Sequence, residues 1–212
     1  LLIVSSSGGP VLKGEGTQFI KIWDLEKESE LKSLSTEKGT ISAAVMLPGN
    51  RYVVSGFKGG DIAVWDVKTG EMLRRWKGHE KDMIALLALP DGRHILSVGE
   101  NTIIVWNVET GREAQRIRTS EKLAVPAALV PDGRKVLIAS SEDFMNLWDL
   151  EAEKKVLRLK GHSGTVSAAA VSPDGRLALT SAWDNTIRVW ELETGNLLKT
   201  FQEGMISNIS IF

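Results

Sequence analysis

The chain has 212 residues, of which 42% are apolar and 25% charged, and its formal net charge is −1. This is ordinary globular composition, and a charge so close to zero provides no overall field that would draw the protein onto nucleic acid or an anionic membrane. The chain contains no cysteine, which excludes disulfides and thiolate catalysis and fits a reducing compartment, so we expect a cytoplasmic protein.

The sequence shows neither a membrane-spanning segment nor a signal peptide. No apolar run approaches the roughly 18 residues of a membrane-spanning helix. The opening Leu-Leu-Ile-Val lacks the charged flank of a signal peptide and has no initiator Met. We therefore expect no membrane contact, and we interpret the sequence as a piece of a longer polypeptide.

Short runs of β-branched and apolar residues follow one another along the chain, with turn residues between them, which predicts successive antiparallel strands. The first run covers residues 1–6. Later runs come in groups of four, in which the second run follows a Pro-Asp-Gly turn or a variant of it and the fourth mostly follows Thr-Gly. We expect second strands at 51–57, 93–98, 134–140 and 176–182, and fourth strands at 72–77, 113–118, 155–160 and 197–202.

Tryptophan recurs in the third run of each group at a nearly fixed interval. The positions are Trp23, Trp65, Trp106, Trp148 and Trp190, with gaps of 42, 41, 42 and 42 residues. A sustained period of this size indicates one structural unit copied five times. The sequence therefore predicts a single repeat domain over residues 1–212.

Each unit of about 40 residues closes its third strand with Trp-Asp or a close variant, and the best copy begins with Gly161-His162 and ends at Trp190-Glu191. These features resemble the WD-repeat β-propeller family over the whole chain. The resemblance implies an all-β fold, a β-propeller of four-stranded antiparallel blades made of five WD-type repeats.

The two chain ends leave the number of blades open. Residues 206–212 align with 166–172 and could pair with residues 1–6, which would complete the first blade of 1–35 and cover its open edge. The result would be a closed five-bladed ring. The other architecture is a segment of a larger propeller, whose remaining blades belong to a longer parent chain.

One set of residues looks chemical. In the family, a His, a hydroxyl, an Asp and the repeated Trp form a hydrogen-bonded chain, and the resemblance places His162, Thr180, Asp184 and Trp190 in those roles. A hydroxyl, His and carboxylate are also the set of a hydrolase. We favour a structural role, because the groups satisfy one another's buried polar atoms and other copies lose members of the set, as where Ile138 stands at the hydroxyl position.

Other candidate sites have simpler explanations. His94 has no second His or Cys at ligand spacing, so we expect no metal, and nothing in the sequence calls for a cofactor. The glycine-rich run 8–16 lacks the Gly-Lys-Ser/Thr ending of a phosphate loop, and we interpret it as a long loop. Basic residues such as Arg74 and Arg75 fall in outer strands, where their charge disfavours pairing with a further strand. We therefore interpret them as edge residues and expect no nucleic-acid partner.

The resemblance implies a partner-binding face at the turns after each second strand and the loops before each first strand. Trp183 is the strongest candidate, because it stands in such a turn, outside the register of the repeated Trp. We expect it to form an exposed apolar anchor with Met83, Leu123 and Met205. The residues assigned to this face are Trp183, Met83, Leu123, Met205, Ser167, Lys58 and Ser141.

The sequence thus favours a non-catalytic scaffold that binds a protein or peptide, as a module of a larger signalling or assembly protein. An alternative is that these blades complete a larger propeller whose binding site lies elsewhere. A remote third hypothesis is a propeller enzyme, which would need paired acids or metal ligands that the Ala, Ser and Met of the inner strands do not offer.

Overall fold

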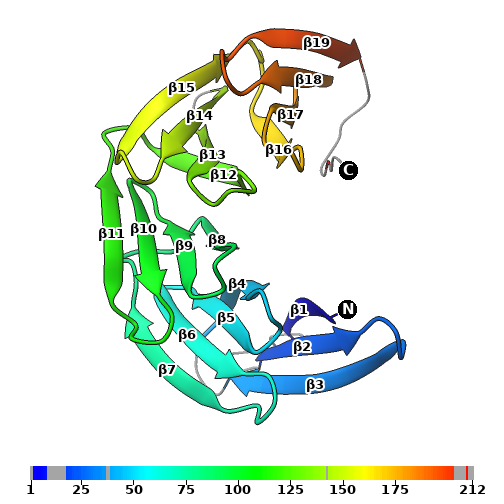
Figure 1. The fold of residues 1–212 in the computed structure, drawn as a ribbon, viewed down its shortest axis with the longest axis vertical. Helices are drawn as coiled ribbons and strands as arrows, with labels where there is room; N and C mark the ends of the chain where they lie inside the picture. The colour runs from blue at the N-terminus through cyan, green and yellow to red at the C-terminus, as the bar shows by residue number, and fades with distance from the viewer. Residues whose placement is uncertain (1, 9–17, 37–38, 142, 203–208, 210–212) are drawn as a thin grey trace. The chain divides into compact units, whose positions relative to one another are not determined.

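The computed structural model describes residues 2–8, 18–36, 39–141, 143–202 and 209, and all regular structure in them is β. The strands form five antiparallel sheets, and within each sheet the strands lie in the order in which they follow along the chain (Figure 1). This confirms the predicted all-β class and the four-stranded units. Among the described residues there is no helix long and apolar enough to cross a membrane.

The first sheet has three described strands and the other four sheets have four each. The first sheet holds β1 (Leu2–Gly8), β2 (Gln18–Asp24) and β3 (Ser29–Thr36). The second holds β4 (Ile41–Met46), β5 (Tyr52–Phe57), β6 (Asp61–Asp66) and β7 (Met72–Lys77), and the third holds β8 (Ala85–Ala88), β9 (His94–Val98), β10 (Thr102–Asn107) and β11 (Glu113–Arg118). The fourth holds β12 (Leu123–Leu129), β13 (Lys135–Ser140), β14 (Phe144–Asp149) and β15 (Lys154–Lys160), and the fifth holds β16 (Val166–Val171), β17 (Leu177–Ala182), β18 (Thr186–Glu191) and β19 (Leu197–Gln202).

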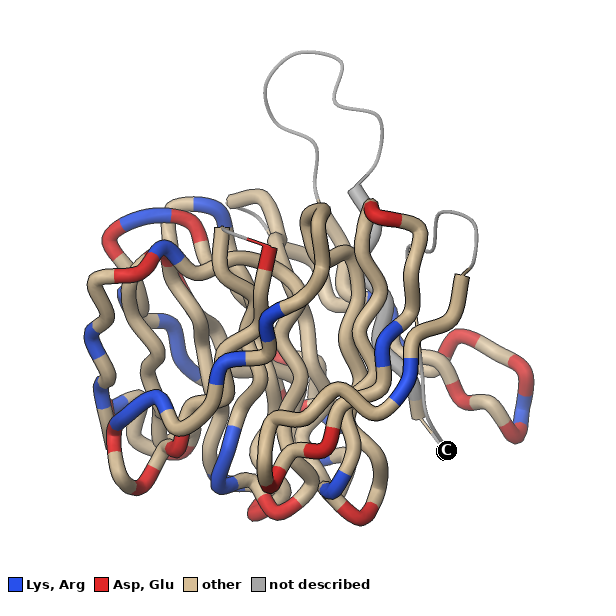
Figure 2. Tube along the Cα trace, turned by 90° about the horizontal axis from the view of Figure 1, so that it is seen from above, with Lys and Arg blue, Asp and Glu red and all other residues tan. Residues whose placement is uncertain are grey.

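Every four-stranded sheet has two ends with different connections. We call one the loop end: it holds the turn between the second and third strands and the loop that leads into the first strand. We call the other the hairpin end, because it holds the turns that join the first strand to the second and the third to the fourth. Figure 2 shows that Asp and Glu gather in the turns of the hairpin ends.

The predicted strand bounds are close to those observed. Three of the four predicted outer strands match β7, β11 and β19 residue for residue, while β15 begins one residue early at Lys154. Each second strand begins one residue later than predicted, because the Arg assigned to it belongs to the turn. In the third sheet, for example, the Arg93 amide donates to Asp91 Oδ1 at 2.8 Å and so completes the turn before β9 starts.

The chain divides into two compact units. Unit 1 consists of residues 1–99 and 104–115, and unit 2 of residues 100–103 and 116–212. The predicted single domain stays a prediction. So do the blade count and the closing strand at 206–212, since all of those residues except Ile209 lie outside the described part of the chain.

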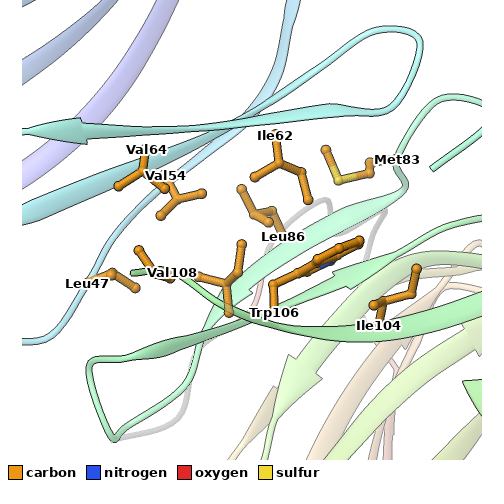
Figure 3. Packing of buried hydrophobic residues seen from close by; sticks show 10 residues of the cluster. Leu47, Val54, Ile62, Val64, Met83, Leu86, Ile104, Trp106 and Val108 are labelled. Carbon is orange, nitrogen blue, oxygen red and sulfur yellow. The ribbon is translucent and has the colours of Figure 1, made fainter. Parts of the chain in front are cut away.

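The repeated Trp of the second, third and fifth sheets is buried against the sheet that precedes it. In unit 1, Trp65 packs with Ile20 and Ile22 of the first sheet. Trp106 packs with Val54 and Ile62 of the second sheet (Figure 3). These contacts explain the period of the sequence, since each unit needs one large apolar side chain to fill the gap to its predecessor.

Unit 2 repeats this arrangement in its own core. Trp190 and Leu192 of the fifth sheet pack with Leu137, Leu147 and Leu159 of the fourth. Inner strands buried on both faces, such as β5 and β13, therefore have nearly continuous apolar runs instead of an alternating pattern.

Candidate functional site

The loop end of the fifth sheet carries the most complete polar network of the chain, in unit 2. Trp190 Nε1 donates to Thr180 Oγ1 at 2.8 Å, and Thr180 Oγ1 lies 2.7 Å from His162 Nε2. His162 Nδ1 lies 2.9 Å from Asp184 Oδ2. The four residues proposed from the family resemblance thus lie in one hydrogen-bonded chain, which we call the tetrad.

Burial and hydrogen bonding set the protonation of the tetrad. Burial lowers the pKa of His162, and the nearby Asp184 only partly opposes this. Burial would raise the pKa of Asp184, but hydrogen bonds from the Ser163 amide, Thr186 and His162 lower it to about 2. The pair is therefore a neutral imidazole and a carboxylate at neutral pH. His162 Nδ1 carries the proton that Asp184 accepts, and Nε2 accepts from the Thr180 hydroxyl.

Asp184 also connects the two segments that form this loop end. Its Oδ2 accepts from the Ser163 amide at 2.9 Å, in the loop before β16. Its Oδ1 accepts from the amide and the hydroxyl of Thr186, at 3.0 and 2.7 Å, at the start of β18. One carboxylate thus fixes both the loop and the turn.

Trp183 stands on the turn that this carboxylate fixes. Its side chain is 67% exposed, while its amide donates to the Thr165 carbonyl at 3.0 Å. The turn ends with the Asn185 amide bonded to the Ala182 carbonyl at 3.1 Å. The backbone under the exposed indole is therefore held from both sides, and the indole faces solvent.

The third and second sheets, in unit 1, keep parts of the same network. In the third sheet, Ser97 Oγ accepts from Trp106 Nε1 at 2.8 Å and lies 2.7 Å from His79 Nε2. In the second sheet, Ser55 Oγ accepts from Trp65 Nε1 at 2.8 Å. The bond between hydroxyl and indole is the feature that these three sheets share.

The fourth sheet has replaced the network by an ionic one. Glu121 accepts from Asn146 Nδ2 at 2.7 Å and pairs with both Lys155 and Arg158. Burial opposes ionisation of Glu121, but the two cations and Asn146 outweigh it and lower its pKa. In this sheet Ile138 stands opposite Asn146, where the fifth sheet has Thr180 opposite Arg188.

Two of the residues predicted to form an exposed apolar surface are buried instead. Met83, only 7% exposed, packs into the core of unit 1, where Gly56 leaves room for it: a Cβ on Gly56 would lie 2.3 Å from Met83 Cε. Leu123, 1% exposed, pairs with Ser140, just as Val166 pairs with Ala182. The predicted register of β12 was therefore one residue off, and Leu123 occupies the core position. Met205 lies outside the described residues.

The remaining predicted residues do lie at loop ends. In unit 2, Ser141 is exposed and its amide donates to the Lys122 carbonyl, while Ser167 lies 3.1 Å from Ser181 through their hydroxyls. In unit 1, Lys58 is exposed and its amide donates to the Thr40 carbonyl at 2.7 Å.

The corrected register brings in Lys122, which the sequence analysis did not assign to the site. Lys122 occupies the place that Thr165 has in the fifth sheet, and its ammonium lies 3.1 Å from Glu100 Oε1. Val125, in β12, is 58% exposed and takes over the role of an exposed apolar side chain that Leu123 was expected to have. The equivalence of Lys122 and Thr165 follows from the backbone hydrogen bonds of the loop end, and the spacing of residues in the sequence carries no signal of it.

Within the described ranges, no three His, Asp or Glu side chains gather as a metal site would require.

Comparison with known protein families agrees with this geometry. The family model "WD domain, G-beta repeat" matches residues 70–107 and 153–191. The first match contains His79, Ser97 and Trp106, and the second contains the whole tetrad. The two matched segments are therefore those in which a His lies against the hydroxyl that accepts from the indole.

Curated relatives match over less than half of the chain. A p21-activated protein kinase-interacting protein 1-like protein of Xenopus laevis is 34% identical over 89 residues, which is 42% of this chain and 24% of that protein. A WD repeat-containing protein 3 homolog of Dictyostelium discoideum is 27% identical over 99 residues, 47% of this chain and 10% of that protein. WD repeat-containing protein 18 of Rattus norvegicus is 27% identical over 90 residues, 42% of this chain and 21% of that protein. The chain thus spans a quarter or less of these relatives.

Proposed function

Because this chain belongs to the WD-repeat family, we propose that it is a non-catalytic scaffold that binds a protein or peptide partner at its loop ends, with Trp183 as the anchor. WD repeats and WD-repeat relatives support a protein-interaction role in general. The proposal specifies further that the partner binds at the loop ends and that Trp183 anchors it.

The exposure of Trp183 on a fixed turn is the observation that carries this proposal. A Trp side chain offers a large apolar area, and Trp is enriched among the residues that dominate binding energy at interfaces. Exposing it to water is unfavourable unless something covers it. Because the turn is already held by Asp184 and Thr165, little backbone order remains to be lost on binding.

Polar groups around the indole suit a peptide partner. Ser163 and Thr165 lie exposed in the loop that the tetrad holds beside the Trp183 turn. Lys122 and Ser141 are exposed at the loop end of the fourth sheet, in the same unit. An apolar anchor with a polar, solvent-accessible rim is the usual arrangement of a protein interface.

The tetrad is better suited to bracing than to catalysis. The Thr180 hydroxyl is fully buried, and it is engaged by both Trp190 and His162. A nucleophile must reach its substrate, and this hydroxyl faces only protein atoms. We therefore assign the tetrad the task of fixing the turn that presents Trp183.

We further propose that the chain acts in the cytoplasm as part of a larger signalling or assembly protein. The relatives are at least about four times longer than the matched segments. One of them is named for its interaction with a p21-activated protein kinase, which is a signalling role. The absence of cysteine fits a reducing compartment.

Affinity capture with three forms of the chain tests the proposal. The baits are the unchanged chain, Trp183→Ala, and Leu198→Ala as a control that removes another exposed apolar side chain, from outer strand β19. We expect the same protein to be retained by the unchanged chain and by Leu198→Ala. Its retention by Trp183→Ala should fall at least about 30-fold, which corresponds to about 2 kcal/mol. Equal capture by all three folded baits would overturn the proposal.

A second candidate role is supported by a different observation. Phe201 in β19 is 40% exposed, whereas Leu159, at the same position of β15, is 1% exposed. The outer strand of the fifth sheet thus shows an apolar side chain that its counterpart in the fourth sheet keeps covered. This supports the alternative that the sheets complete a larger propeller whose binding site lies elsewhere, and equal capture in the experiment above would favour it.

A further inference from the structure

A pocket of about 290 Å³ lies at the hairpin end of unit 1, between the second and third sheets. The residues that line it are Arg51, Tyr52, Val64, Leu73, Arg74, Val108 and Glu109. Trp183 stands at a loop end of unit 2, so this pocket is a separate surface from the one proposed above.

Solvent reaches apolar side chains in the walls of the pocket. Leu73 is 51% exposed, and Tyr52 is half-buried. Val64 and Val108, only 2% and 3% exposed, belong to the core cluster of unit 1 and lie beneath these walls as the floor (Figure 3). An aliphatic side chain of a ligand would therefore cover apolar surface that now faces water, which favours its binding.

The exposure of Leu73 arises from an irregularity in the backbone pairing of β7. The register with β6 shifts at the step from Val64 to Trp65, which leaves Leu73 without a paired residue. The same shift in β3 leaves Leu31 45% exposed at the equivalent place of its outer strand. Leu31 does not line the pocket, so it provides a matched comparison for Leu73.

Two arginines line the pocket, and each lies against a neighbouring residue. The Arg51 guanidinium lies over the Tyr52 ring, 4.8 Å from its centroid. Arg74 passes close to Gly111, where a Cβ would lie 2.7 Å from Arg74 Cδ. Within the described ranges, neither guanidinium lies within ion-pair distance of a carboxylate, whereas that of the next residue, Arg75, does. Both charges are therefore available to a ligand.

The charges around the pocket favour a single carboxylate over a polyanion. The lining carries Arg51 and Arg74 against Glu109, and the turns of the hairpin ends are otherwise acidic (Figure 2). Attraction at long range is therefore weak, and a chain of nucleic-acid phosphates would gain little. At short range a guanidinium still forms two parallel hydrogen bonds to one carboxylate.

We propose that this pocket binds an extended segment of a partner protein in which Asp or Glu stands next to Leu, Ile or Val. The aliphatic side chain packs against Tyr52 and Leu73, and the neighbouring carboxylate pairs with Arg51 and Arg74. Binding at this pocket does not involve Trp183.

The test begins with a phage-displayed library of random short peptides, selected on the unchanged chain. The binding of the selected peptides to the chain and its variants is then measured by fluorescence anisotropy. Leu73→Ser removes the aliphatic wall of the pocket. Leu31→Ser is its control, because it makes the same change at the equivalent place of β3.

A second pair of variants tests the charges. Arg51→Gln with Arg74→Gln removes both guanidinium groups of the pocket. Arg93→Gln with Arg118→Gln removes as much charge from exposed positions outside it, and Arg93 holds in the third sheet the place that Arg51 holds in the second. Thermal unfolding of each variant verifies that it is folded.

We expect a family of selected peptides in which Asp or Glu is adjacent to Leu, Ile or Val. Leu73→Ser and the Arg51/Arg74 variant should each weaken their binding at least about tenfold. The two controls and Trp183→Ala should bind these peptides as the unchanged chain does. If the only enriched peptides are lost with Trp183→Ala and kept by the pocket variants, this inference fails and the loop-end proposal stands.

Three other results would overturn the inference: no enrichment of acidic and aliphatic peptides, equal binding to either pocket variant, or equal weakening by its control. Other occupants are tested directly. If phosphoserine in place of the selected Asp or Glu, or a short single-stranded DNA, binds at least about tenfold more tightly than the selected peptide, the proposed carboxylate is wrong. If sedimentation shows a dimer that the Arg51/Arg74 variant dissociates, the occupant is a second copy of the chain.

Discussion

Ile138 stands at the position of β13 that Thr180, the acceptor of the Trp190 indole N–H, occupies in β17. Ile138 pairs with Asn146 two residues before Trp148, and Thr180 pairs with Arg188 two residues before Trp190. Among the described residues, the buried Nε1 of Trp148 has no hydrogen-bond partner, whereas Nε1 of Trp190 does. The repeated Trp of the fourth sheet is therefore still buried, but its indole N–H lacks the hydrogen bond that Trp190 makes in the fifth.

Restoring a hydroxyl at position 138 should give this indole its acceptor. Ile138→Val and Ile138→Thr shorten the side chain equally and differ only in one methyl or hydroxyl. We expect Ile138→Thr to be more stable than Ile138→Val by about 1 kcal/mol, because the new hydroxyl accepts from Trp148 Nε1. Urea unfolding of both variants measures the difference. At an ordinary fully buried site such as Val53, Val→Thr should destabilise, and the same sign at position 138 would contradict the proposed bond.

Removing the hydroxyl where it is present should cost more in the fifth sheet than in the second. Thr180→Val leaves both Trp190 Nε1 and His162 Nε2 without their partner, and we expect a loss of about 3 kcal/mol. Ser55→Ala affects the bond to Trp65 Nε1, and we expect a loss of about 1 kcal/mol. Chemical unfolding of the two near-isosteric variants provides the comparison. Equal losses would mean that His162 gains nothing from Thr180.

Much of this fold could be predicted, because turn chemistry and the Trp period both mark the same boundaries. Asp91 illustrates the agreement: its carboxylate accepts from the amides of Arg93 and His94, and it sits at the predicted reversal. The one-residue error at the start of β9, β13 and β17 has the same origin. From the sequence, the Arg after the turn is predicted as the first residue of the strand. Its amide instead donates to the side chain of the turn Asp, so the Arg still belongs to the turn.

The candidate site was predicted less well, because it depends on register and on packing between sheets. Leu123 was misplaced because the strand it begins has a register irregularity between Ala124 and Ala127, which apolar spacing does not reveal. Met83 was misplaced because its burial depends on Gly56, a residue of the neighbouring sheet. The exposure of Trp183 could be predicted because this residue stands outside the register of the repeated Trp.

Acid should weaken the fold through Asp184. Its pKa is about 2 in the folded protein, against 3.8 as an ordinary value. The unfolded chain therefore takes up this proton at a higher pH than the folded one. The stabilisation is fully present above about pH 4 and is lost as the pH falls toward 2, with a size of about 2 kcal/mol. We expect the stability difference between the unchanged chain and Asp184→Asn to shrink over this window.

Thermal unfolding at a series of pH values between 5 and 2 measures that difference. Asp184→Asn keeps an oxygen that can accept from Ser163 or Thr186 but removes the charge. A difference that stays constant with pH would show that the charge of Asp184 does not contribute to stability.

His162 should make a separate contribution to the pH dependence of stability. Its pKa is lowered in the folded protein, so the unfolded chain binds the proton more readily and stability declines as the pH falls below about 6.5. His162→Gln should remove that decline, which the same series of thermal unfolding experiments, extended to pH 7, would measure.

Two glycines with nearly the same backbone angle should respond very differently to alanine. Gly49 has φ of 89° and Gly60 has φ of 88°, so both lie in the left-handed region where a Cβ is strained. A Cβ on Gly49 would meet nothing within 4 Å, whereas on Gly60 it would lie 2.2 Å from the His79 carbonyl oxygen and 2.4 Å from that of Lys81. We expect Gly49→Ala to cost about 1 kcal/mol and Gly60→Ala about 3 kcal/mol or more, because backbone atoms must move. Urea unfolding compares them, and similar losses would mean that the segment from Gly78 to Lys81 can shift away from the turn without cost.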